Sequence, residues 1–359
     1  MKCFIITHRG IENIASKEIE DLIKVKSKIE ETVAIFDCKK NDLHKLCYKG
    51  QTFIKVLEFI SAIDVDDEIE EKIMQELKNV KVGKTFRIKC KRIGKHNFSS
   101  SDIEQETGKP IFDNNKTKVD LHNPETIIYI YVYNKKCYIG KDLSTVDLSK
   151  RDYKIFVHPA SIKGTIAAAL IKVAGFTNKK ALLDPFCGSG TIPIEAAFFA
   201  GNFSQNYFTK NKFLFKIDLK EEKPKKLNIY GYDMHLKHTF AARKNAKIAG
   251  VEDSIKISKS ELSWLDTKLK EKEIDVIVTD PPRMNKNIRE KDYASFMKEL
   301  FYQSKYLLKD KGNITLLTNS RSLEIMEKEA KNHDFVVHEL YDIYSGEEGL
   351  IIVKFIKGK

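Results

Sequence analysis

The sequence predicts an α+β N-terminal half followed by a Rossmann-like α/β half, and three observations support this. The chain has 359 residues, which exceeds one ordinary domain and suggests two or three. Up to residue 147 the strand and helix patterns follow the orders of small α+β units, whereas from residue 161 each strand alternates with a helix, as in a doubly wound sheet. Hydrophobic residues make up 42% of the chain, enough for a core in each half.

Residues 1–62 have the pattern of a ferredoxin-like unit. Apolar residues at helical spacing predict an amphipathic helix over residues 10–24, with Ile11, Ile14 and Ile19 on its inner face. The order strand, helix, strand, helix, strand is typical of this fold. The predicted strands are residues 3–6, 32–37 and 53–59, and the second helix starts at residues 42–48.

The next segment, residues 63–144, is strongly basic. Between residues 84 and 141 the chain has 12 Lys and Arg against 6 Asp and Glu, which accounts for half of the +12 net charge of the whole chain. Such an excess favours an anionic partner, because each cation that meets a phosphate releases counterions. The predicted elements are helices at 68–79 and after Ser99, and strands at 85–92, 118–121, 126–133 and 136–140.

The basic strand at residues 85–92 is a candidate RNA contact. Its alternation places Arg87, Lys89 and Lys91 on one face. The aromatic Phe98 in the following loop favours RNA over a merely solvated face, because bases stack on aromatic rings. The predicted RNA-binding residues are Arg87, Lys89, Lys91, Arg92 and Lys95.

After a connector at residues 148–159, helices and strands alternate to the end of the chain. Gly250 is a natural stop for the helix before it, and Gly312 predicts a turn before the fifth strand. The predicted helices are 161–174, 191–200, 236–249 and 293–308. The predicted strands are 181–184, 227–232, 254–258, 274–279 and 313–318, with a closing antiparallel pair at 335–343 and 349–356.

The most informative local feature is a glycine turn between a strand and a helix, Asp184-Pro185-Phe186-Cys187-Gly188-Ser189-Gly190-Thr191. Its glycines allow a ligand to approach the backbone, and the helix start offers free N–H groups to a carboxylate or phosphate. A dinucleotide fingerprint is disfavoured, because Pro193 occupies the third glycine position and the next strand-end acid, Asp233, lies 43 residues after Gly190. A purely structural tight turn remains open.

Two further strand ends carry carboxylates. Asp233 follows Tyr230-Gly231-Tyr232 and is placed to accept both hydroxyls of a ribose, although a helix-capping role is compatible with this. Asp280-Pro281-Pro282 follows a buried strand, and the prolines make the loop stiff while its oxygens stay free. A rigid set of acceptors suits an exocyclic amine that must attack a methyl group in line. An ordinary loop is the alternative.

Other functions are disfavoured by composition. The six cysteines form no C-x-x-C pair, and His235 and His238 have no third ligand nearby, so we expect neither disulfides nor a metal site. No apolar run approaches the roughly 20 residues of a membrane span. We therefore expect a soluble cytoplasmic protein without a membrane partner, and the sequence predicts no oligomeric state.

These C-terminal motifs resemble those of class I methyltransferases that act on amino groups of nucleobases. The run from Asp184 to Thr191, with Glu195-Ala196-Ala197 after it, is similar to their donor-binding motif. Asp280-Pro281-Pro282 is similar to their catalytic loop, and the residues from His158 to Lys163 resemble the element before the donor motif in the THUMP-containing subgroup.

The N-terminal half extends the resemblance to nearly the whole chain. Residues 86–92, 118–124 and 137–140 follow the THUMP pattern, and Arg9-Gly10-Ile11-Glu12 is similar to the accompanying ferredoxin-like domain. The resemblance implies a ferredoxin-like domain at 1–62 completed by the connector at 145–160, a THUMP RNA-binding domain at 63–144 and a Rossmann-like catalytic domain at 161–359.

The resemblance also implies the cofactor, the substrate and the residue roles. S-adenosylmethionine would be the methyl donor, transfer would be direct and without a metal, and RNA would be the partner. The implied cofactor-binding residues are His158, Asp184, Pro185, Phe186, Cys187, Gly188, Ser189, Gly190, Thr191, Asp233, Met234, Ser260, Glu261 and Asp280. The implied catalytic residues are Asp280, Pro281, Pro282 and Arg283, of which Asp280 and the carbonyl of Pro281 would hold a guanine amine.

Two departures from the family pattern affect these expectations. Arg283 stands where the family has an aromatic residue that stacks on the base, and Ser258-Lys259-Ser260-Glu261 stands where an acid and a small residue usually hold the adenine. A guanidinium plane also stacks on bases. The expected activity is N2 methylation of a tRNA guanosine in the acceptor-stem region. The alternatives are a guanine-N2 methyltransferase of ribosomal RNA, a non-catalytic RNA-binding protein, and a methyltransferase of protein or small-molecule amines.

Overall fold

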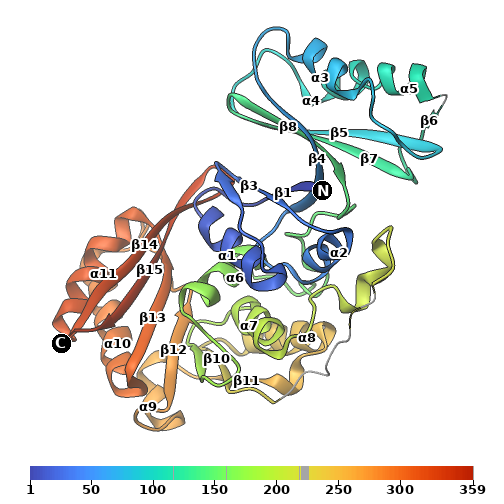
Figure 1. Ribbon diagram of the computed structural model, residues 1–359. Coiled ribbons are helices and arrows are strands. Elements are labelled where there is room, and N and C mark those ends of the chain that lie inside the picture. The colour runs from blue at the N-terminus through green and yellow to red at the C-terminus, as the bar shows by residue number, and fades with distance from the viewer. Residues whose placement is uncertain (116, 159, 218, 220–225, 359) are drawn as a thin grey trace.

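The computed structural model describes residues 1–115, 117–158, 160–217, 219 and 226–358 in two lobes, each built on one sheet (Figure 1). The N-terminal sheet has eight strands in the order β2-β3-β1-β4-β8-β7-β5-β6. They are β1 (Lys2–Ile6), β2 (Lys28–Glu30), β3 (Val33–Asp37), β4 (Lys55–Asp64), β5 (Thr85–Ile93), β6 (Lys118–Val119), β7 (Thr126–Tyr133) and β8 (Lys136–Asp142).

The first four strands form the expected ferredoxin-like unit. Helix α1 (Glu12–Ile23) links β1 to β2, and α2 (Lys40–Lys49) links β3 to β4. β1 lies between β3 and β4, antiparallel to both, and β2 pairs with β3 at the edge. β2 was not predicted, because its three largely exposed residues carry no apolar alternation.

β4 joins this unit to the basic segment in one continuous sheet. Its first residues pair with β1, and its ten-residue length lets it continue along β8. Ile128, Ile130 and Val132 of β7 pack under the helices of the segment. These helices are α3 (Ile69–Leu77), α4 (Ser100–Glu106) and α5 (Lys109–Asn115), of which α5 was not predicted.

The C-terminal lobe is the predicted doubly wound sheet, in the order β11-β10-β9-β12-β13-β15-β14. The first five in this order are parallel and the last two form an antiparallel hairpin. The strands are β9 (Leu182–Asp184), β10 (Ile229–Asp233), β11 (Ile255–Lys259), β12 (Ile274–Thr279), β13 (Leu308–Thr318), β14 (Phe335–Ser345) and β15 (Glu348–Lys357). The helices are α6 (Gly164–Val173), α7 (Thr191–Gly201), α8 (Leu236–Ala249), α9 (Leu265–Lys268), α10 (Glu290–Leu307) and α11 (Ser320–Asn332), with short 3₁₀ turns at Tyr207–Lys212, Glu252–Ser254 and Leu262–Trp264.

Two differences from the sequence prediction concern β13 and α11. Gly312 lies within β13 rather than in a turn, beside an irregularity in the β12–β13 register, where a glycine is tolerated in a strand. α11 was not predicted, because its buried residues Ser322, Met326 and Ala330 form only a narrow stripe among many charged side chains.

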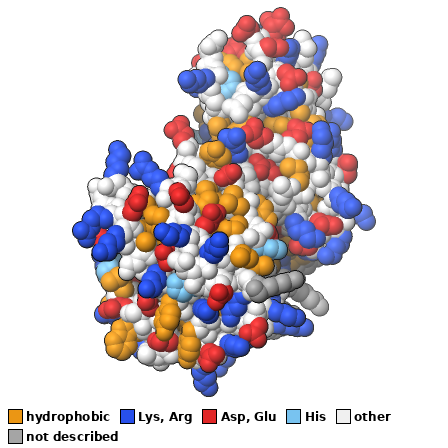
Figure 2. All heavy atoms as spheres, turned by 90° about the vertical axis from the view of Figure 1, so that its left-hand side faces the viewer, with side chains coloured by type: hydrophobic (Ala, Val, Ile, Leu, Met, Phe, Trp, Pro, Cys, Tyr) orange, Lys and Arg blue, Asp and Glu red, His pale blue; other side chains and the backbone are white. Residues whose placement is uncertain are grey.

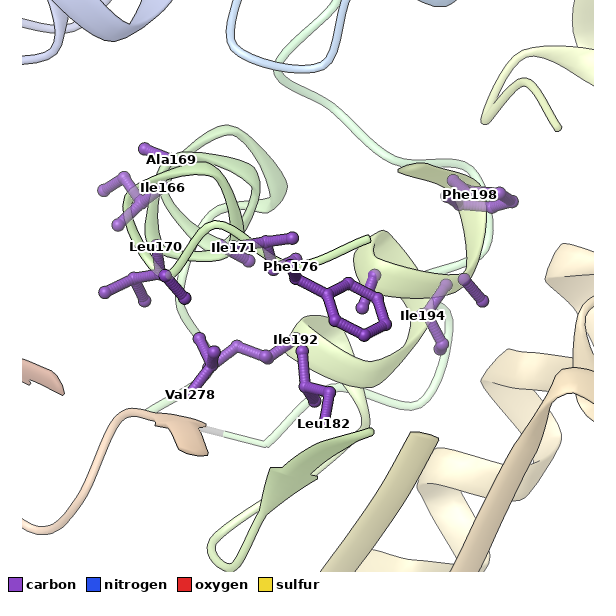
Figure 3. Close-up of a cluster of buried hydrophobic side chains, with 14 of the residues drawn as sticks. Ile166, Ala169, Leu170, Ile171, Phe176, Leu182, Ile192, Ile194, Phe198 and Val278 are labelled. Atoms are coloured by element: carbon purple, nitrogen blue, oxygen red, sulfur yellow. The ribbon is translucent and has the colours of Figure 1, made fainter. Parts of the chain in front are cut away.

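Hydrophobic clusters cover both faces of this sheet. Figure 3 shows one of them, in which side chains of α6 and α7 pack on the sheet. The labelled residues are Ile166, Ala169, Leu170, Ile171, Phe176, Leu182, Ile192, Ile194, Phe198 and Val278. The second cluster lies under α10 and α11. α7 is buried on nearly every side, and its one charged residue is Glu195.

Glu195 is the centre of a buried network that joins the two lobes. Its carboxylate accepts hydrogen bonds from Arg151 Nε at 2.7 Å, Tyr153 Oη at 2.8 Å and Gln51 Nε2 at 2.9 Å. Arg151 Nη2 also donates to the carbonyl of Gln51 at 2.8 Å. The network therefore links the ferredoxin-like unit, the connector and the helix that begins at the glycine turn.

On the face shown in Figure 2, Lys and Arg side chains are prominent along the outer edges, and hydrophobic side chains gather toward the middle. Within the described residues, no helix is long and apolar enough to cross a membrane, and the six cysteines are free.

Candidate functional site

One cavity of about 630 Å³ lies where the parallel strands end. β10, β9 and β12 are neighbours, so their carboxyl ends meet at one edge of the sheet, where ligands of such sheets bind. Asp233, Asp184 and Asp280 stand at these three ends and all line the cavity. The three strand-end acids of the sequence analysis therefore belong to one site, whose volume is that of a typical small-molecule pocket.

The glycine turn after β9 forms the middle of the site. Gly188 and Gly190 have φ angles of +51° and +88°, which favour glycine because an L side chain is strained there. A Cβ on Gly188 would have no neighbour closer than 4.0 Å, so the backbone is open beside the cavity that it lines. Gly190 does not line the cavity; it caps α7 and packs so closely that a Cβ would lie 3.0 Å from that of Ala242.

Asp233 ties the turn to the start of α8. Its Oδ2 accepts a hydrogen bond from Gly188 N at 3.1 Å, and its Oδ1 accepts from His235 N at 2.8 Å and lies 3.0 Å from His238 Nδ1. Asp233 is not the N-cap of α8, as considered in the sequence analysis, because that position is His235; its bond to His235 N fixes it beside the helix start. Because Oδ2 has one protein donor and the residue lines the cavity, it retains capacity to accept a ligand hydroxyl.

Asp184 is a buried bridge between β9 and β12. Its Oδ1 accepts hydrogen bonds from Thr279 Oγ1 at 2.6 Å and Phe186 N at 3.2 Å. Burial raises the pKa of Asp184 to about 8. This side chain holds two strand ends in register at the centre of the site.

Asp280 lies at the other end of the site, in a loop that is hydrogen-bonded to the start of α11. Met284 N donates to Ser322 Oγ at 2.9 Å, and Asn319 Nδ2 donates to the Met284 carbonyl at 3.3 Å, so the start of α11 fixes the loop. Burial raises the pKa of Asp280 to about 6, although the neighbouring Arg283 acts in the opposite direction. The carboxylate is therefore a better proton acceptor than an exposed aspartate.

Arg283 forms an ion pair with Asp280. Its Nη2 lies 2.7 Å from Asp280 Oδ1, and its Nη1 lies 3.4 Å from Glu348 Oε1 of β15. Its Nε is buried and has no hydrogen-bond partner among the described residues. The guanidinium thus lies in the cavity wall beside the carboxylate, where the family pattern has an aromatic ring.

Most of the predicted site residues come together in the cavity, and the fold adds others. Besides the residues above, the predicted His158, Pro185, Phe186, Cys187, Ser189, Thr191, Met234, Ser260, Glu261, Pro281 and Pro282 line it. Sequence reasoning missed Ala160, Ser161, Ile162, Ile192, His235, His238, Leu262, Ser263, Phe296 and Glu299. The sequence favours a solvated helix face for His235 and His238 over a metal site and does not predict that they line the cavity. Phe296 and Glu299 come from α10, the helix after the Asp280 loop, and their helical spacing places both on one face.

The predicted RNA-binding residues lie on the other lobe and divide into two groups. In the β5–β7 pairing, Lys89 lies opposite Tyr129 and Lys91 lies opposite Tyr131. Burial and neighbouring cations lower the pKa of Lys89. Arg92 instead lies over the ring of Phe98, on the side of the loop that carries Lys95.

No group of three His, Cys, Asp or Glu side chains among the described residues is placed to hold a metal ion.

Two family models match the chain. Residues 151–346, more than half of the chain, match the RMKL-like methyltransferase domain, and residues 63–142 match the THUMP domain.

Two curated relatives carry the same printed description, tRNA (guanine(6)-N2)-methyltransferase. The protein of Methanocaldococcus jannaschii is 29% identical over 376 residues, covering 96% of this chain and 97% of the relative. The protein of Archaeoglobus fulgidus is 30% identical over 299 residues, covering 76% and 71%. Among solved structures, a putative methyltransferase complexed with SAH superposes over 100% of this chain and 98% of its own, with a TM-score of 0.79 and 19% identity. That structural likeness concerns the fold.

Proposed function

The chain belongs to the family with the RMKL-like methyltransferase domain and carries a THUMP domain, and we propose that it methylates N2 of a guanosine in the acceptor-stem region of tRNA. The coarser activity, S-adenosylmethionine-dependent methylation of RNA, is that of the family. The tRNA and guanine-N2 assignments are supported by the two archaeal relatives, which are similar over most of the chain.

The observation that carries the proposal is the single cavity with Asp233 at one end, the glycine turn in the middle and Asp280 at the other end. We assign Asp233 to the nucleoside and Asp280 to the amine, because their strand ends lie along one line with an open backbone between them. Methyl transfer requires this order, because the donor methyl and the acceptor nitrogen must face each other.

The residues present fit S-adenosylmethionine. The open side of Gly188 accepts close approach by the methionine portion, Asp233 Oδ2 has capacity for a ribose hydroxyl, and Ser260 and Glu261 line the wall beyond β11 for the adenine. When bound, the cofactor supplies an electrophilic methyl group. Gln51, Arg151 and Glu195 hold α7, and thereby the turn, in place.

On the acceptor side, Asp280 and the carbonyl of Pro281 hold the two N–H groups of the guanine amine. An Asp280 oxygen receives the proton as the nitrogen becomes positive, a role that its raised pKa favours. Arg283 offers a planar guanidinium to the base face in place of the ring. The base must displace or share the ion pair between Arg283 and Asp280.

We divide the chain into a ferredoxin-like domain at residues 1–62 completed by 145–160, a THUMP domain at 63–144 and a catalytic domain at 161–359. The THUMP domain binds RNA, and its basic face would place the RNA relative to the catalytic cavity.

The direct test is mass spectrometry of nucleosides from unmodified tRNA treated with the protein and labelled S-adenosylmethionine. We expect N2-methylguanosine in one acceptor-stem fragment, and none with the Asp280→Ala variant. Label in ribosomal RNA but not in tRNA would instead assign the protein to ribosomal RNA. If the protein neither transfers methyl groups nor binds the donor in calorimetry, the result would favour a non-catalytic RNA-binding protein.

Reversal of two charges on β5 should weaken RNA binding selectively. For Lys89→Glu with Lys91→Glu, we expect tRNA affinity to fall about 10- to 100-fold at low salt, because two phosphate contacts become repulsive. Calorimetric donor affinity should stay unchanged. The matched control is Lys328→Glu with Lys331→Glu on the exposed face of α11. Equal losses in both double variants would contradict a specific contact at β5.

A further inference from the structure

Six large apolar side chains are exposed in two segments that also carry cavity-lining residues, among them His158 and His238. They come from the connector and from the start of α8, and are between 38% and 65% exposed: Ile155, Phe156, Val157, Met234, Leu236 and Phe240. We call this set the apolar ridge. Met234 also lines the cavity, so the ridge continues into the site. Contiguous exposed apolar surface of this kind marks an interaction site.

The ridge is held rigidly by a buried asparagine. Asn245 Oδ1 accepts from Phe156 N at 3.0 Å, and its Nδ2 donates to the Phe156 carbonyl at 2.9 Å. The same Nδ2 lies 2.9 Å from the carbonyl of Ser189 in the glycine turn. The backbone at Phe156 is therefore fixed relative to the cofactor half of the cavity.

A lysine joins the two parts of the ridge. Lys244 Nζ lies 4.6 Å from the centre of the Phe156 ring and 4.5 Å from that of Phe240. Connector and helix thus present one surface. The cavity-lining His158 and His235 have rings 4.4 and 4.9 Å from that of His238.

The charged side chains of the two ridge segments are all basic. Residues 154–163 and 234–249 contain Lys154, Lys163, Lys237, Arg243, Lys244 and Lys247, and no Asp or Glu. Lys237 and Lys244 are exposed on α8. Apolar and aromatic surface beside the exposed Lys237 and Lys244 matches a nucleic acid single strand, whose bases stack while its phosphates meet the cations.

We propose that the apolar ridge binds the unpaired nucleotides that flank the target guanosine, with bases on Phe240 and Leu236 and phosphates at Lys237 and Lys244. This inference rests on the proposed function. In a helix, one N–H of the guanine amine is bonded to the paired cytosine and the neighbouring bases cover both faces of the ring, so the target base must leave its helix to reach Asp280. Its neighbours then lose stacking partners, and a rigid apolar surface at the cavity mouth replaces them.

The test uses the full-length variant Leu236→Ser with Phe240→Ser, which alters only solvent-exposed side chains. We expect affinity for an unmodified tRNA transcript, measured by fluorescence anisotropy, to fall about tenfold, as for the loss of one stacked base. The KM for tRNA should rise accordingly, with kcat and calorimetric donor affinity unchanged. Lys244→Ala should reduce the salt dependence of tRNA binding by about one counterion. The control is Trp264→Ser with Tyr302→Ser, a similarly exposed pair outside the ridge.

Unchanged tRNA affinity in the ridge variant, with wild-type methylation intact, overturns the inference. It is equally overturned if the ridge variant instead loses binding to anionic phospholipid vesicles, or changes from dimer to monomer in light scattering, while tRNA affinity is kept. Absence of tRNA methylation by the wild-type protein overturns the proposed function, and the two failures are therefore distinguishable.

Discussion

Asp280→Ala is expected to lower the rate of methyl transfer by about 10³-fold while tRNA affinity stays within twofold of the wild type. In the proposed mechanism this carboxylate holds the amine and receives its proton, and such groups contribute about 10²- to 10⁴-fold. Single-turnover transfer of tritiated methyl groups to tRNA measures the rate. Retained turnover would remove Asp280 from the reaction.

The pH dependence gives a second readout for Asp280. Because burial raises its pKa to about 6, kcat/KM of the wild-type protein should fall as the pH drops below that value, when the protonated carboxyl no longer accepts the amine's hydrogen. The isosteric Asp280→Asn variant should lack this acidic limb. The same limb in both proteins would mean that another group titrates.

Glu195→Ala should destabilise the protein by about 3–5 kcal/mol, because it leaves the Arg151 guanidinium buried without its carboxylate. Both side chains are at most 1% exposed, so water cannot replace the lost partner. We expect the Tm in differential scanning calorimetry to fall by about 10 °C. Donor affinity should weaken as well, since α7 carries the glycine turn at its start.

Two further variants distinguish the loss of the buried ion pair from the loss of any one charge. Glu324→Ala, on the exposed face of α11, should leave the Tm within about 1 °C, because exposed substitutions have small effects. Arg151→Met with Glu195→Met should recover part of the lost stability, since removing both charges avoids an unpaired buried one. A double variant as unstable as Glu195→Ala would mean that the shape of the pair, rather than its charge, is required.

The sequence predicted the parts of the fold that depend on local periodicity. The helix predicted at residues 236–249 is α8, with the same bounds, because Gly250 ends it with a φ of +71°. Two of the elements it missed lack such signals: β2 is short and exposed, and α11 buries a narrow stripe. Gly312 misled the prediction because a glycine in a strand resembles a turn residue when the neighbouring strand is unknown.

The site divides in the same way. Strand-end acids could be found in the sequence, since the carboxyl ends of parallel strands meet at one edge and each motif is contiguous. Phe296 and Glu299 could not, because they reach the cavity from a helix that follows the catalytic loop. The contact of Arg283 with Glu348 joins residues 65 positions apart, and no local pattern specifies it.

By itself, the sequence determined which motifs the proposed chemistry uses. The glycine turn, Asp233, the Asp280 loop and the basic β5 strand are short, and their backbone conformation and charge are set locally. Only the tertiary structure decided how that chemistry is arranged. It paired Asp280 with Arg283, bound Glu195 to both lobes, and left an apolar ridge exposed beside the cavity. The physical reason is that ion pairing and burial depend on which distant segments share a surface, and an apolar residue in the sequence does not reveal whether packing will cover it.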